Sequence, residues 1–138
     1  MATRSSISIR NADGSYTGIY CHWDGYLSNN GRTLSQHYTE ESKIRELMAL
    51  GDLSSLGKDI GEKHNFDRCP DDVCNFYGRD RGEDGTQATT RDTLADLMNR
   101  ISQEYDYLWE GNTWHVRFNR THGEFITLAE AQRLVEVN

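Results

Sequence analysis

The first 23 residues carry the pattern that most constrains the fold, because they hold two alternating segments joined by a short turn. In residues 6–10, "SISIR", Ile7 and Ile9 fall on one side and polar residues on the other, which is the period of a half-buried strand. Residues 11–14, "NADG", follow as a turn in which glycine supplies the positive φ. Residues 15–23, "SYTGIYCHW", alternate again, so the two segments together predict a β-hairpin.

Helical periodicity marks several later segments of the chain. In one of them Thr39 is suited to cap the start of the helix and Gly51 is suited to its end. The last of them begins with a capping box formed by Thr127 and Glu130. The predicted helices are residues 39–51, 89–105 and 126–138, with a further short helix at 32–38.

A second hairpin is predicted in residues 105–118, "YDYLWEGNTWHVRF", where the chain turns near Gly111. Residues 51–87 are mostly irregular, with a short strand at 74–78, and a loop this long in a small domain is often functional or mobile. We therefore expect a single domain over residues 1–138 of the α+β class. It would have two layers, an antiparallel sheet from two β-hairpins with about three helices packed on one face.

The charge balance narrows the class of partner. Acidic residues outnumber basic ones by 22 to 15, which gives a net charge of -7, so generic nucleic-acid binding is disfavoured. A local basic pocket, or an acidic surface for a basic protein, stays open. The chain has no apolar run near the roughly 20 residues of a membrane span and no signal-type stretch at its start. With an odd number of cysteines, these features predict reduced thiols and a cytoplasmic location.

Cys21 and His22 are adjacent in the second predicted strand, and this spacing argues against a simple catalytic pair. Neighbouring residues on a strand point to opposite faces, so His22 cannot readily serve Cys21 as a base. Cys21 shares the face of the isoleucines and is predicted to be a small buried hydrophobe. A nucleophilic Cys21 would need a histidine from elsewhere, such as His64 or His115.

The opposite face of the first hairpin is the predicted functional surface. It offers arginines for an anion, a histidine and aromatic rings, which are the ingredients of a nucleotide or phosphate pocket. A plain solvated sheet face would have the same polar pattern, and the two aromatic residues at the strand end suit base stacking or core packing equally. The candidate binding residues here are Arg4, Arg10, Tyr20, His22, Trp23, Asp24 and Tyr26.

A possible metal site lies in "HNFDRCPDDVC", residues 64–74. His64, Cys69 and Cys74 are three candidate zinc ligands within eleven residues, although H-x4-C-x4-C is not a standard zinc-finger spacing. A fourth ligand would come from Cys21, His22 or Asp67. The alternative is two free cysteines and a surface histidine.

The segment "FYGRDRGEDG", residues 76–85, alternates charges with glycines and is typical of a mobile polar loop. Arg79 and Arg81 are candidate contacts for an anion or an acidic partner. Asp80, Glu83 and Asp84 could bind a divalent cation, but the spacing is not that of an EF-hand. A solvated loop without a ligand is the alternative.

Four stretches, "TRSSI", "IYCHWDGY", "LGDLSSLG" and "FYGRDRGE", resemble a family of small uncharacterised proteins encoded by bacteriophages and prophages. The resemblance covers about the first 85 residues, and "YCHWDGY" is its most specific part. No reaction is assigned to that family, so no catalytic residue follows from it. It implies a context, a small accessory protein in the cytoplasm of an infected bacterium, where many such proteins counter host defence.

Three functions are compatible with the sequence. The first is a protein that acts by binding and inhibits a host defence complex, in the manner of an anti-CRISPR protein. The second binds or sequesters a small nucleotide, and the third is a small hydrolase acting on a phosphate ester through His22 and a carboxylate. The chain has no P-loop, dinucleotide fingerprint, HExxH or GxSxG motif, which favours binding over catalysis. No cofactor is expected other than the zinc considered above.

Overall fold

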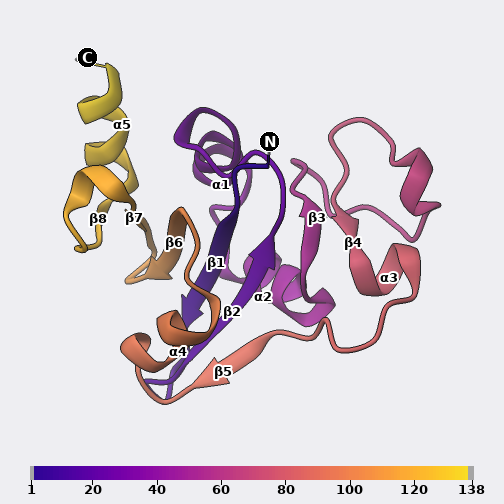
Figure 1. The fold of residues 1–138 in the computed structure, drawn as a ribbon, viewed down its shortest axis with the longest axis horizontal. Helices are drawn as coiled ribbons and strands as arrows, with labels where there is room; N and C mark the ends of the chain where they lie inside the picture. The colour runs from indigo at the N-terminus through magenta and orange to yellow at the C-terminus, as the bar shows by residue number, and fades with distance from the viewer. Residues whose placement is uncertain (1, 137–138) are drawn as a thin grey trace.

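The computed structural model describes residues 2–136 and has an α+β fold built around one mixed sheet (Figure 1). The strands are β1 (Ser5–Arg10), β2 (Tyr16–Cys21), β3 (Leu53–Ser55), β4 (Asn75–Phe76), β5 (Thr89–Arg91), β6 (Tyr105–Glu110), β7 (Thr113–Arg117) and β8 (Ile126–Thr127). The helices are α1 (Arg32–His37), α2 (Glu41–Leu50), α3 (Tyr77–Arg81), α4 (Leu94–Ile101) and α5 (Leu128–Glu136). Short helical turns lie at Leu27–Gly31, Phe66–Arg68 and Asn119–Thr121.

Both predicted hairpins are confirmed, but the sheet is larger and not purely antiparallel. The strand order is β4-β3-β2-β1-β6-β7-β8, and β5 pairs with the start of β2. The hairpins β1–β2 and β6–β7 are antiparallel, and the second turns through Gly111 and Asn112, both with positive φ. The joins β1–β6 and β2–β3 are parallel. Between β2 and β3 the chain crosses over through α1 and α2, and it enters β6 from α4, which follows β5.

The main core lies on one face of the sheet. Ile7, Ile9 and Ile19 point to this face and belong to one buried cluster. The cluster also takes in Leu34 of α1 and Leu128 of α5. The burial of this face is what the alternation in the first hairpin predicts.

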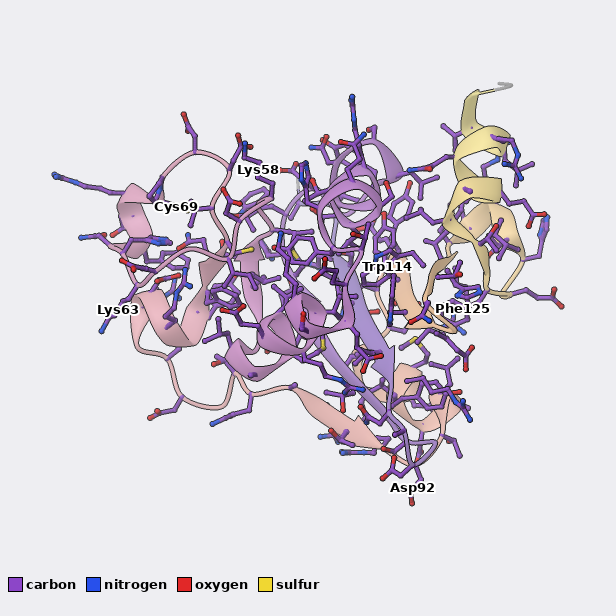
Figure 2. All side chains as sticks on the ribbon, turned by 180° about the vertical axis from the view of Figure 1, so that it is seen from behind. Lys58, Lys63, Cys69, Asp92, Trp114 and Phe125 are labelled. Atoms are coloured by element: carbon purple, nitrogen blue, oxygen red, sulfur yellow. The ribbon has the colours of Figure 1, made fainter. Side chains whose placement is uncertain are left out.

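The expectation that the helices cover only one face is wrong, because α4 packs on the other. At Gly18 of β2 a Cβ atom would overlap the Cδ1 atom of Ile101 and lie 2.5 Å from the Oγ atom of Ser8. Glycine and serine at these positions allow α4 to approach the backbone closely, and Leu97 is then fully buried. Figure 1 shows α4 on the near side of the sheet, while α1 and α2 come forward in the reverse view of Figure 2.

The helix ends follow the predicted caps in part. The Oγ1 atom of Thr127 accepts from the backbone N–H of Glu130 at 3.2 Å, and Gly51 follows the last residue of α2 with φ 86°. Thr39 is not the cap of α2, since the N-cap is Glu40 and makes no side-chain capping bond. The helix predicted from residue 89 begins at Leu94, because the preceding residues pair with β2 as β5. Of the predicted terminal helix, residues 137–138 lie outside the described residues.

Candidate functional site

The sheet face opposite the main core is covered by α4 only in part. The part that α4 leaves uncovered carries a group of aromatic side chains, which we call the aromatic face: Tyr20, His22, Trp23, Phe66 and Tyr77. Its position follows from strand register. Cys21 pairs with Leu53, and Leu53 pairs with Phe76, and all three side chains are fully buried. Their chain neighbours point to the opposite side of the sheet, so Tyr20 of β2, and Tyr77, which begins α3 directly after β4, present their rings there.

A hydrogen bond links two side chains of this face, and a third lies beside them. The Tyr20 hydroxyl lies 2.6 Å from the Nδ1 atom of His22, and which of the two groups donates depends on the histidine tautomer. Burial raises the pKa of Tyr20 and outweighs the opposite effect of the nearby Arg4 charge, which keeps this hydroxyl protonated. Among the described residues, no hydrogen bond uses the Nε2 atom of His22.

Trp23 and Tyr26 extend the face beyond the end of β2. The Trp23 ring stands edge-on to His22, with centroids 4.8 Å apart, and 44% of Trp23 is exposed. Tyr26 is 37% exposed, and its hydroxyl lies 3.3 Å from a carboxylate oxygen of Asp24. The backbone N–H of Trp23 donates to the carbonyl of Ser54, so this segment is tied to β3.

A second group of side chains forms the far end of the aromatic face. Phe66 and Tyr77 stack with centroids 5.6 Å apart. The Arg81 guanidinium lies over both rings, 4.8 Å from the Phe66 centroid, and pairs with Glu83 at 3.1 Å. Arg81 is therefore exposed at the surface beside two aromatic rings, as a binding role requires.

Arg79 does not present a free cation, unlike the predicted role. Its side chain is 12% exposed and donates to both carboxylate oxygens of Asp80. Its remaining N–H groups donate to the carbonyls of Ile60, Gly61 and Cys74. Arg79 and Asp80 thus hold residues 60–80 together, and neither is available to a partner or a divalent cation in this structure.

Arg10 lies apart from the other candidates, at the opposite end of β1 from Arg4. It pairs with Glu110 at 3.4 Å and lines a surface hollow of about 200 Å³ together with Asn11 and Arg45. The structure therefore brings Arg4, Tyr20, His22 and Trp23 together and leaves Arg10 outside the group.

Each of the three candidate zinc ligands makes hydrogen bonds to a different group. His64 Nε2 lies 2.9 Å from the Oδ1 atom of Asn75, and the Cys74 thiol lies 3.2 Å from the Tyr38 hydroxyl in the core. Cys69 donates to the carbonyl of Val73, and Figure 2 shows Cys69 at the end of the molecule opposite Phe125. Within residues 2–136, no group of three or more His, Cys, Asp or Glu side chains is placed to hold a metal ion.

The three thiols differ in exposure, and this predicts their order of reaction. Cys21 and Cys74 are fully buried, and burial raises the pKa of the Cys21 thiol to about 12. Cys69 is partly exposed. Ellman's reagent at pH 8 is therefore expected to titrate one thiol in the folded protein and three in guanidinium chloride. Cys69→Ser should abolish the reaction of the folded protein, and a rapid reaction remaining in that variant would contradict the buried state of the other two.

Phe66 and Tyr77 were missed as site residues. The strand predicted at residues 74–78 is shorter in the structure, because β4 ends at Phe76 and Tyr77 begins α3. Tyr77 still carried a signal, since the residue after a buried strand residue points to the opposite face. No local pattern marks Phe66, which reaches the face through the turn at Phe66–Arg68.

Comparisons with known proteins do not add to this geometry, because no family model, curated protein or solved structure matches the chain. Among the described residues, no helix has the length and apolar character needed to cross a membrane.

Proposed function

We propose that this protein acts by binding and inhibits a host defence protein complex, with the aromatic face as its contact surface. The observation that carries the proposal is the exposure of Trp23 and Tyr26, at 44% and 37%, beside Arg4. Tryptophan, tyrosine and arginine dominate the energetics of protein interfaces. An exposed tryptophan held in place by His22 and by the backbone of β3 is suited to serve as such an anchor.

The chemistry at His22 favours binding over hydrolysis. Its Nδ1 atom faces a tyrosine hydroxyl rather than a carboxylate. A catalytic histidine is commonly oriented by a carboxylate on the ring nitrogen that does not face the substrate. The nearby Asp52 carboxylate accepts from the backbone N–H of Tyr20 instead of orienting the imidazole.

The choice of a host defence complex as partner rests on two features of the sequence. One is the resemblance of the first 85 residues to small bacteriophage proteins. The other is the net charge of -7, which suits a basic nucleic-acid channel on a partner protein. The resemblance and the charge argument are both part of the proposal, and the capture experiment described next tests them.

Trp23→Ala is expected to weaken binding to the partner by at least about tenfold, because it removes the exposed anchor of the face. The tagged protein would be captured with its partner from a bacterial host lysate, identified by native mass spectrometry, and the affinity measured with the purified pair. Val135→Ala is the matched control, since Val135 is 44% exposed but lies on α5.

Equal affinity of Trp23→Ala and the unmodified protein would show that the aromatic face is not the contact. Weaker binding by Val135→Ala alone would place the contact on α5. Absence of any stoichiometric protein partner would count against the inhibitor proposal itself.

A further inference from the structure

We propose that Arg4, Tyr20 and His22 form a binding site for the phosphate group of a mononucleotide, with Trp23 flanking its base. The site lies on the aromatic face but does not depend on the protein partner proposed above. Its chemistry follows from which polar groups of the face already have partners and which do not.

The first element is an arginine without a counter-charge. Arg4 is exposed, and none of the ion pairs formed among the side chains of residues 2–135 includes it. Its neighbour Tyr20 is a neutral hydroxyl and does not compensate the positive charge of Arg4. Arg10 and Arg81, in contrast, each pair with a glutamate. A guanidinium in this state offers the paired N–H donors that phosphate oxygens accept.

The second element is the open ring nitrogen of His22. The Tyr20 hydroxyl faces Nδ1 at 2.6 Å, and no hydrogen bond among the described residues uses Nε2. When Tyr20 donates to Nδ1, the ring proton lies on Nε2, and this is the tautomer that a phosphate oxygen would select. A phosphate that bridges Arg4 and His22 Nε2 would then receive hydrogen bonds from both side chains.

The third element is the aromatic surface beside these donors. Trp23 meets His22 edge-on at an interplanar angle of 86°, and nearly half of the side chain remains exposed. Stacking of a nucleobase on an aromatic side chain contributes roughly 1–3 kcal/mol and tolerates different bases. The site therefore combines a phosphate anchor with a surface for a base.

The surrounding charge selects a small ligand over a polynucleotide. Asp24 follows Trp23 directly and is exposed, and Glu104, just before β6, is exposed as well. Together with the net charge of -7, these carboxylates would repel the successive phosphates of a nucleic-acid strand. This repulsion grows with the number of phosphates, so a free mononucleotide, which brings a single phosphate to Arg4, is the ligand we assign.

The test uses the full chain and four probes: the ribonucleoside 5′-monophosphates, the matching nucleosides, inorganic phosphate, and a ten-nucleotide single-stranded DNA. Binding is measured by isothermal titration calorimetry and by tryptophan fluorescence. The fluorescence response would come from Trp23, because Trp109 and Trp114 are only 5% exposed. Arg4→Gln tests the phosphate anchor, and Arg120→Gln, an exposed arginine beyond β7, is the matched control.

We expect at least one monophosphate to bind at least tenfold more tightly than its nucleoside, and Arg4→Gln, but not Arg120→Gln, to lose this tenfold. Trp23→Ala should weaken monophosphate binding and leave inorganic phosphate unaffected. The inference is overturned if no monophosphate binds at millimolar concentration, if nucleosides bind as well as nucleotides, or if Arg4→Gln has no effect. Tighter binding of the oligonucleotide would overturn the choice of a mononucleotide. None of these results depends on whether a host protein is captured, so the two proposals fail separately.

Discussion

Asp80→Asn is expected to lower the free energy of unfolding by about 3 kcal/mol or more. The Asp80 carboxylate has no exposed area and accepts hydrogen bonds from the backbone N–H groups of His64 and Phe76 and from Arg79. The amide would leave the Arg79 guanidinium, which is 12% exposed, without its counter-charge. Breaking a buried pair on one side costs more than the pair contributes, because the remaining charge stays desolvated.

Urea unfolding at pH 7, followed by circular dichroism, measures this loss. Asp84→Asn is the matched control, since it removes the same charge from an exposed position four residues later and should change the free energy by less than about 0.5 kcal/mol. Equal stability of the two variants would show that the Asp80 network does not hold the fold together.

The same carboxylate gives the stability a pH dependence of known sign. Burial alone would raise the pKa of Asp80, but the hydrogen bonds from Arg79, Phe76 and His64 outweigh it and hold the pKa below its ordinary value. Folding is therefore stabilised above the pKa of an unfolded aspartate, and the contribution is lost as the pH falls through the lower pKa of the folded state. Asp80→Asn should lack this acid-dependent component.

The Asp80 network also bears on function, because it supports one end of the aromatic face. Asp80 fixes the chain at Phe76 and at His64, two residues before Phe66. Loss of the network would let Phe66 separate from Tyr77 and release Arg81 from their rings. The far end of the face would then lose its shape before the Arg4 end does.

The hairpins were predictable because they are encoded locally. Alternation in β1 and β2 requires only neighbouring residues, and the Gly111–Asn112 turn carries its own φ preference. The second face was not predictable in this way. Ser6 and Ser8 are polar, yet both are fully buried, because small side chains in the sheet let α4 pack against it. Polarity alone cannot distinguish a solvated face from one covered through close backbone contact.

The same difference between local patterns and distant contacts separates the site residues that were predictable from those that were not. Strand parity placed Arg4, Tyr20 and His22 on one face, and in the structure Tyr20 hydrogen-bonds to His22 while the charge of Arg4 acts on Tyr20. Arg79 was misplaced, because a buried ion pair and a solvated loop have the same alternation of charges in sequence. The burial of Arg79 depends on carbonyls up to 19 residues away, which no local pattern reports.

Gly51→Ala is the second substitution with a large expected effect, a loss of about 3 kcal/mol or more in the free energy of unfolding. Gly51 has φ 86° and ψ -153°, a conformation that residues with a side chain rarely adopt. A Cβ atom there would also overlap the backbone carbonyl oxygen of Thr86, which accepts from the N–H of Asp52. Backbone on both sides of the contact must move to relieve the overlap.

Gly82→Ala is the control, because Gly82 is also a glycine of positive φ, with φ 76° and ψ 24°, and no atom lies within 4 Å of its Cβ position. It carries only the cost of the left-handed helical region, about 1 kcal/mol. Gly51→Ala adds to this the higher cost of its own backbone conformation and the overlap with Thr86. Thermal and urea unfolding should therefore show the larger loss in Gly51→Ala, and equal losses would contradict both added costs. A larger loss matters for function, because Asp52 accepts from the N–H of Tyr20 and so connects the Thr86 contact to the centre of the aromatic face.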